Sequence, residues 1–164
     1  MTTASRRTGE KGQRTPRSLD AYQEKEGIKG AAYCACGAVF RNKRWVHESS
    51  SGAIRQEGHD ILCPACRRIT DQNPAGIISL SGGFYAAHEA EINNLINHTA
   101  QTSAAKNPLG RVIDISKEKD GVTITTTDVK LAQKIGRVVF KAHGGELHYT
   151  WSHAGPPVRV TWSR

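Results

Sequence analysis

Long apolar runs are absent from this chain of 164 residues. A membrane-spanning helix needs about 18 consecutive apolar residues, and no such stretch occurs, so we predict no membrane partner. The amino-terminal residues also lack the apolar segment of a secretory signal peptide. We therefore expect a cytoplasmic protein with reduced cysteines, and the length suits one modest domain with attachments.

Recognisable catalytic motifs are missing as well. No Ser/His/Asp or Cys/His set has persuasive spacing, and the glycine-rich residues 79–83 lack the Lys-Ser/Thr ending of a phosphate-binding loop. His143-Gly-Gly-Glu146 stands where a helix needs a glycine to end, so we interpret it as a helix terminus. The sequence thus predicts a protein that is not an enzyme and has no small-molecule substrate.

Acidic residues are scarce, since 15 Asp and Glu stand against 23 Lys and Arg, and the net charge is +8. The cations are unevenly spread, because residues 71–105 contain no Lys or Arg. Segregated positive charge favours a polyanionic partner, with nucleic acid first and an anionic membrane surface only second.

The four cysteines form two close pairs, Cys34-Ala-Cys36-Gly37 and Cys63-Pro-Ala-Cys66. Two short hooks of this kind, separated by a couple of dozen residues, are typical of a tetrahedral Zn²⁺ site. Glycine after the first hook and proline inside the second favour the tight turns that bring two thiolates together. Four thiolates leave no open coordination position, so the pattern predicts one structural zinc ion.

Four alternatives to this four-cysteine site stay open, and the first is four free structural thiols without a metal. Disulfides would require an oxidising compartment. A thioredoxin-type redox pair should open a helix after a strand, and residues 67–71 fit that poorly. His47 or His59 could replace one cysteine, and an open metal position would then allow a zinc enzyme.

The composition divides the chain into three regions. Residues 1–29 are predicted to be a flexible basic tail, because they are polar and contain almost no apolar side chains. Residues 30–73 form a zinc-ribbon-like module, in which apolar residues flank residues 41–44 as in a hairpin with a basic tip.

Residues 74–164 show the element order of a ferredoxin-like α+β sandwich with one extra strand. We predict strands over residues 75–80, 111–116, 122–127, 147–151 and 158–162, and helices over residues 85–101 and 128–143. Pro156-Pro157 is expected to turn the chain between the last two strands. Both helices should cover one face of the sheet and leave the other open.

The open face is expected to present Thr123, Thr125, His148, Thr150, Arg159 and Thr161. None of these is aromatic, so we do not expect the base stacking of common RNA-recognition motifs.

The helix over residues 128–143 carries a stripe of positive charge. Leu131, Ile135, Val138 and Ala142 are predicted to form its apolar seam. The cations repeat the same spacing one position earlier, and no acidic residue follows Asp128 in this helix. We predict phosphate contacts from this stripe and from the zinc module, through Lys130, Lys134, Arg137, Lys141, Arg41, Lys43, Arg44, Arg67 and Arg68.

A family resemblance extends over about residues 33–163. The paired cysteines precede an Ile-rich strand, a helix, Gly121-Val-Thr-Ile124, the helical segment Leu131-Ala-Gln-Lys-Ile-Gly136 and a Gly-Gly-Glu-Leu strand. This succession resembles the central region of the archaeal and eukaryotic adaptor family of the large ribosomal subunit, which serves nuclear export in eukaryotes. It is also similar to a family of short bacterial proteins that pair Cys-x-Cys-Gly and Cys-Pro-x-Cys with the same α/β unit.

The resemblance implies binding to the ribosome, at the large subunit or the intersubunit region, because the adaptors cover tRNA-related positions there. Two departures limit it: the first hook is Cys-x-Cys, and the further domains of the larger adaptors have no counterpart in this sequence. An export or maturation role is therefore not carried over.

Residues and resemblance together predict a non-enzymatic zinc protein that binds structured RNA, with the ribosome as its partner. Such a protein would act in ribosome assembly, quality control or the stress-linked silencing of translation known as hibernation. The alternative is a zinc-dependent protein-interaction or DNA-binding regulatory module that docks on a polymerase or promoter.

Overall fold

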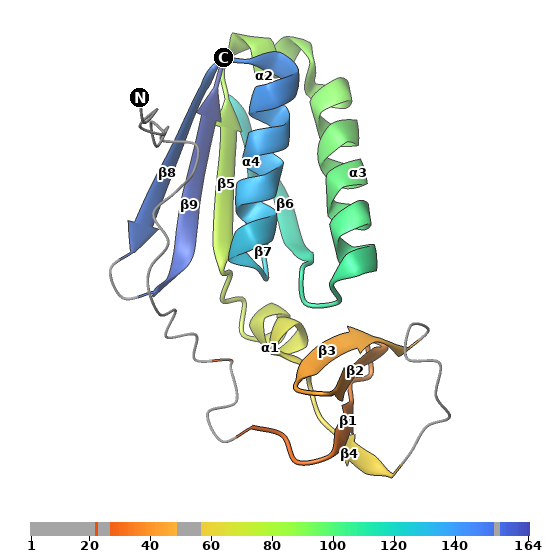
Figure 1. Cartoon of the computed structure of the whole chain (residues 1–164). Coiled ribbons are helices and arrows are strands. Elements are labelled where there is room, and N and C mark those ends of the chain that lie inside the picture. Colours follow the sequence, from red (N-terminus) through yellow and green to blue (C-terminus); the bar gives the residue numbers. More distant parts are fainter. Residues whose placement is uncertain (1–21, 23–26, 49–56, 153–154) are drawn as a thin grey trace, which may run out of the picture.

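The computed structural model describes Tyr22 and residues 27–48, 57–152 and 155–164. These residues form a small four-stranded sheet with a short helix, followed by a five-stranded sheet with two long helices and one short helix (Figure 1). The predicted α+β class, with a small cysteine module beside an α/β domain, is confirmed. Of the predicted basic tail, residues 1–21 and 23–26 lie outside the described residues.

The cysteine module begins with the smaller sheet. Its elements are β1 (Ala31–Tyr33), β2 (Ala38–Arg41), β3 (Arg44–His47), β4 (Gly58–Asp60) and α1 (Pro64–Thr70). The strand order is β3-β2-β1-β4, with β4 parallel to β1. β2 and β3 form the predicted hairpin, and Asn42 and Lys43 at its tip have φ values of 50° and 63°. Two consecutive residues with positive φ match the twist of a tight antiparallel hairpin.

The larger sheet and its helices make up the α+β domain. Its elements are β5 (Gly76–Ser81), α2 (Gly83–Ala87), α3 (Glu89–Lys106), β6 (Val112–Glu118), β7 (Gly121–Thr126), α4 (Val129–His143), β8 (Glu146–Ser152) and β9 (Gly155–Ser163). The strand order is β6-β7-β5-β9-β8. α3 and α4 lie side by side against one face of the sheet (Figure 1).

The extra strand lies inside the sheet and not at its edge. β5 pairs antiparallel with β7, and β7 with β6, as a ferredoxin-like arrangement requires. β9 then inserts between β5 and β8, parallel to the first and antiparallel to the second. The chain therefore runs out to the edge as β8 and returns towards the centre as β9.

Two local predictions differ from the structure. The first helix breaks at His88, which has φ −121° and ψ 23°, so α2 and α3 replace one continuous helix. Pro156 and Pro157 lie within β9 and are joined by a cis peptide bond, whereas we predicted them in the turn. They precede Val158, where pairing with β5 begins near this end of the sheet, so their missing N–H groups cost no bond to that strand.

The buried face of α4 also differs from the predicted seam. Val138 is half-buried and Ala142 is exposed, although both were expected to face the sheet. A Cβ atom at Gly136 would lie 2.5 Å from Val160 Cγ1, so the helix approaches the sheet closely through small residues. A search for large apolar side chains overlooks such residues. The buried positions are Leu131, Ala132, Ile135, Gly136 and Val139.

The predicted open sheet face is polar, as its sequence indicated. One row across all five strands consists of the paired residues Ser116, Thr123, Ser79, Thr161 and His148. The strands' other face carries the domain's core, including Ile78, Ile124 and Trp162, each at most 1% exposed. Within the described residues, no helix is long and apolar enough to cross a membrane.

Candidate metal centre and cationic surface

The four cysteine sulfurs converge at one point between β1, the loop after it and the start of α1. All four lie within 4.8 Å of one another. Cys34 Sγ is 3.6 Å from Cys66 Sγ, and Cys36 Sγ is 3.7 Å from Cys63 Sγ. Zn–S bonds of about 2.3 Å in a tetrahedron place sulfurs about 3.8 Å apart, so these spacings fit zinc. A disulfide would require about 2.05 Å, which these separations exclude.

The first hook is shaped by its backbone. Cys34 donates its N–H to the Ala38 carbonyl at 2.8 Å, and Gly37 donates to the Cys34 carbonyl at 3.0 Å. Gly37 has φ 90°, a conformation that glycine adopts without strain. The turn thus points both sulfurs of Cys34 and Cys36 to the same side.

The second hook is the first turn of α1. Cys63 is the N-cap of this helix, Pro64 follows it at a position that favours helix entry, and Cys66 donates its N–H to Cys63 Sγ at 3.4 Å. Cys63 donates its own N–H to Cys34 Sγ at 3.2 Å. Such N–H···S bonds lower the negative charge on the sulfurs and fix their directions.

This helix corrects one step of the sequence reasoning. We argued against a redox pair because residues 67–71 seemed a poor helix start, yet α1 begins directly after Cys63. Thiol redox chemistry is disfavoured instead by the convergence of all four sulfurs. A dithiol pair needs only two of them.

The acid–base properties of the thiols favour a cation among them. Burial raises the pKa of Cys63, and the neighbouring cysteines raise it further, although the backbone hydrogen bond with Cys66 opposes this. Burial also raises the pKa of Cys36. Burial would raise the pKa of Cys34 too, but hydrogen bonds with Cys36 and Cys63 bring it down to about 7. Four thiolates at these distances repel one another unless a metal ion neutralises them.

The sulfurs therefore hold the ligand geometry of one structural zinc ion, with Cys34, Cys36, Cys63 and Cys66 as ligands. In the described part of the chain, these cysteines are the one group of three or more His, Cys, Asp or Glu residues arranged for a metal. When bound, zinc would close the hooks and supply folding free energy to the small sheet.

Neither histidine between the hooks lies in this cluster. His47 Nε2 is 2.6 Å from the Ala104 carbonyl oxygen on α3. His59 is an exposed residue of β4, paired with Ala32. The alternative of a histidine ligand with an open metal position therefore has no counterpart in the arrangement of these residues.

Arg111 is the residue of this site that the sequence reasoning missed. Its Nη2 donates to Cys66 Sγ at 3.1 Å and to Cys63 Sγ at 3.5 Å, although it belongs to the α+β domain. Burial alone would lower the pKa of Arg111, but the hydrogen bond with Cys66 and the charges of the cysteines raise it. No spacing rule relates residue 111 to the cysteines, so only the folded chain reveals the contact.

The predicted phosphate-binding residues of the zinc module divide into two groups. Lys43 and Arg44, at the tip of the β2–β3 hairpin, are exposed. Arg41 is half-buried and donates to the Tyr33 hydroxyl at 3.0 Å.

Arg67 and Arg68 on α1 have structural partners. Arg68 is only 4% exposed, donates to the Asn73 carbonyl at 3.0 Å, and stacks on Tyr22 at 4.4 Å. Arg67 is half-buried and donates to the Tyr22 carbonyl at 3.3 Å. Arg68 therefore holds Tyr22 against α1, and we no longer assign it to phosphate contact. The sequence placed Tyr22 in the flexible tail.

The cationic stripe of α4 is largely exposed to solvent. Lys130, Arg137 and Lys141 are exposed, whereas Lys134 is half-buried and donates to Ser103 Oγ on α3 at 2.9 Å. The helix starts at the predicted position, residue 128, where the Asp128 carboxylate caps it by accepting from the Leu131 N–H at 3.3 Å. It ends at Gly144 with φ 68°, as the His143-Gly-Gly-Glu146 segment suggested.

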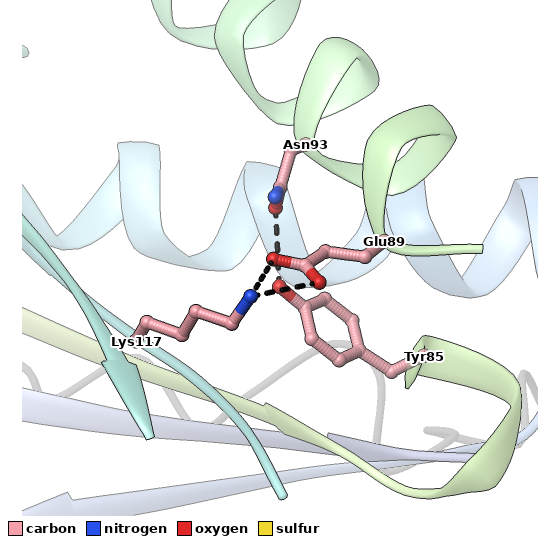
Figure 2. A network of polar contacts seen from close by, with 4 residues as sticks. All are labelled: Tyr85, Glu89, Asn93 and Lys117. Atoms are coloured by element: carbon pink, nitrogen blue, oxygen red, sulfur yellow. Dashed lines mark hydrogen bonds and ion pairs between the residues drawn. The ribbon is translucent and has the colours of Figure 1, made fainter. Parts of the chain in front are cut away.

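A second polar cluster lies at the opposite end of the α+β domain. Figure 2 shows Tyr85 directed at Asn93, with hydroxyl and Oδ1 3.3 Å apart, and Lys117 bridging both oxygens of Glu89. Burial raises the pKa of Tyr85, so its hydroxyl remains a donor. The Lys117 side chain is 73% exposed. We interpret these contacts as structural. The Tyr85–Asn93 hydrogen bond joins α2 to α3, and the Glu89–Lys117 ion pair joins α3 to β6.

Comparisons with protein-family models, with curated proteins and with solved structures find no match to this chain.

Proposed function

We propose that this protein is a non-enzymatic, zinc-stabilised RNA-binding protein of the cytoplasm whose target is the ribosome. The observation that carries the proposal is the exposed cationic stripe of α4, formed by Lys130, Arg137 and Lys141. Residues 129–143 contain no Asp or Glu that would neutralise it.

The spacing of the stripe suits a polyanionic backbone. Positions 130, 137 and 141 lie within about 40° of one another around a helix of 3.6 residues per turn, and they extend over about 16 Å of its axis. Like charges so arranged destabilise a helix slightly, so stability alone does not favour them. A row of cations along one line is what contact with successive phosphates requires.

The hairpin tip of the zinc module adds a second cationic element. Lys43 and Arg44 project from a sheet that is fixed by the cysteine cluster. α4 begins at the end of the α+β domain nearest α1 (Figure 1). The start of the α4 stripe therefore faces the side of the domain on which the zinc module lies. Phosphate contacts from two rigid elements position a protein on folded RNA without specifying a base sequence.

The large ribosomal subunit or the intersubunit region is the target that the family resemblance supplies. Ribosome binding there would serve assembly, quality control or stress-linked silencing of translation. The polar, non-aromatic open sheet face agrees with binding through phosphates and not through stacked bases.

The test is sedimentation of the tagged protein through sucrose gradients of lysates from growing and starved cells, at low and moderate salt. We expect co-migration with the large subunit or whole ribosomes, and release by salt. A protein that stays at the top in every condition would overturn the ribosomal target, and co-purification with polymerase would favour the DNA-regulatory alternative.

A matched pair of variants tests whether the α4 stripe is the surface that binds the ribosome. Lys130→Gln with Arg137→Gln and Lys141→Gln should weaken binding to purified ribosomes and lower the log–log salt slope by about two to three. Lys106→Gln with Lys117→Gln and Lys119→Gln removes the same three charges from other exposed positions and should bind as the wild type. Equal loss in both variants would mean that only net charge matters.

A further inference from the structure

The cysteine cluster is completed by a residue from the other region of the molecule. Arg111 lies just before β6, 45 residues after Cys66. Its Nη2 reaches the sulfurs of both residues of the second hook, at 3.1 Å from Cys66 and 3.5 Å from Cys63. The side chain is half-buried, so this contact is not a loose surface pairing.

The backbone of Arg111 is held in place by Thr127. The Arg111 N–H donates to Thr127 Oγ1 at 2.9 Å, and the Thr127 N–H donates to the Arg111 carbonyl at 2.9 Å. The Thr127 hydroxyl also donates to the Leu109 carbonyl, and Thr127 is only 6% exposed. These hydrogen bonds fix the backbone of Arg111 beside the β6–β7 pair, and its guanidinium reaches the sulfurs from this fixed position.

Neighbouring contacts join the end of α3 and the segment after it to the zinc module. His47 on β3 lies 2.6 Å from the Ala104 carbonyl oxygen. Leu109 packs against the buried cluster that contains Cys34, Ala38 and Cys63. The connection between α3 and β6 therefore covers one side of the metal centre.

A zinc ion with four thiolates carries a net charge of about −2, and two of these thiolates are almost fully buried. A guanidinium on the sulfurs offsets part of this charge and directs their lone pairs. Groups that hydrogen-bond to metal ligands in this way typically contribute about 10- to 100-fold to metal affinity.

We propose that Arg111 is a positioning residue for the zinc centre, supplied by the α+β domain, so that retention of zinc depends on the contact between the two regions. The inference is independent of the RNA-binding proposal, because it concerns only the metal centre and its support.

The experiment measures zinc affinity of the full chain by competition with a chromophoric chelator. Arg111→Met should bind zinc about 10- to 100-fold more weakly. Arg111→Lys, which keeps the charge but cannot reproduce the planar fork, should fall between Arg111→Met and the wild type. Lys106→Met removes an exposed cation from the end of α3 and should leave zinc affinity unchanged.

Cobalt substitution separates positioning from general stability. In the Co²⁺-loaded chain, the thiolate-to-metal charge-transfer band should shift in Arg111→Met and shift less in Arg111→Lys. Ile124→Ala destabilises the α+β domain without touching the sulfurs and should not shift the band. An Arg111→Met variant with the zinc affinity and cobalt spectrum of Lys106→Met would overturn the proposal, as would an equal loss of affinity in Ile124→Ala.

Discussion

The two regions of this molecule are stabilised by different means. The zinc module buries a small cluster of Cys34, Ala38, Cys63 and Ala65, with Trp45, Cys66 and Leu109 packed around it, and it also buries Ala32, Tyr33 and Val39. The α+β domain buries a continuous core of Ile, Leu, Val and Trp side chains between its sheet and α2, α3 and α4. A region with so little apolar burial needs a cross-link to fold, and four converging thiolates provide the site for one.

The two regions also differ in how far their positively charged side chains are buried. On α4, most cations remain exposed because a full apolar core already holds the helix. On α1, the small core is supplemented by Arg68, which is buried against Tyr22 and the Asn73 carbonyl. The same residue type thus serves as a packing element in one region and as a surface group in the other.

Removal of zinc should produce the largest difference between the two regions. Zinc binding in small zinc-finger peptides contributes about 10–16 kcal/mol, so a chelator should unfold β1–β4 and α1. The α+β domain should keep its structure, because its core contains no metal ligand. Residue-resolved amide NMR spectra with and without chelator measure this, and added zinc should restore the lost signals. Dispersed signals from β1–β4 in metal-free protein would contradict the prediction.

A core truncation in the α+β domain should have the opposite effect. Ile124 is 0% exposed on β7, so Ile124→Ala should lower the free energy of unfolding of this domain by about 2–5 kcal/mol. The zinc content of the folded protein should stay at one ion.

Ile115 offers a matched control for this truncation. It pairs with Ile124 across β6 and β7 but is 45% exposed, so Ile115→Ala should cost much less. Urea unfolding followed by circular dichroism measures both variants. Equal losses would mean that burial is not what stabilises this sheet.

The smallest expected effect concerns the cap of α4. Asp128→Ala removes the carboxylate that accepts from the Leu131 N–H and should cost about 1 kcal/mol. Asp128→Asn retains a good cap, so its loss at neutral pH should be smaller. Thermal unfolding of the two variants measures the difference.

The titration of Asp128 adds a pH-dependent difference in stability between the wild type and Asp128→Asn. Burial raises the pKa of Asp128, although hydrogen bonds from the Lys130 and Leu131 backbone oppose it. The folded state then holds this proton more tightly than the unfolded chain does. The wild type should therefore lose stability relative to Asp128→Asn as pH rises from about 4, the unfolded value, through the raised folded pKa. A constant difference across this range would contradict the assignment.

Local signals in the sequence were sufficient for much of this structure. The spacing of Cys34, Cys36, Cys63 and Cys66 indicated the metal centre, and the predicted strands at 111–116 and 122–127 correspond to the β6–β7 hairpin. Asp128 and Gly144 lie at the ends of α4 as expected. Each of these features depends on residues that are close along the chain, or on a metal-ligand pattern with a fixed spacing.

Features that depend on distant residues were not predictable in this way. The alternation of Val158, Val160 and Trp162 predicted a strand, but alternation does not say which strands will be its neighbours. Arg68 and Arg111 look like any other cation in the sequence, and their partners are set by how α1 and the segment before β6 pack.

The central position of β9 imposes an order on assembly of the sheet. β8 is made before β9 during synthesis, yet β9 lies between it and the other strands of this sheet, so β8 can join the sheet only together with β9 or after it. The contacts of β9 with β5 span about eighty residues of chain, from pairs such as Ile78 and Val160. Such long-range closure is slow relative to hairpin formation. During this interval β5 and the β6–β7 hairpin present an unpaired edge, so a chain interrupted before residue 155 would be left with an open sheet that invites aggregation.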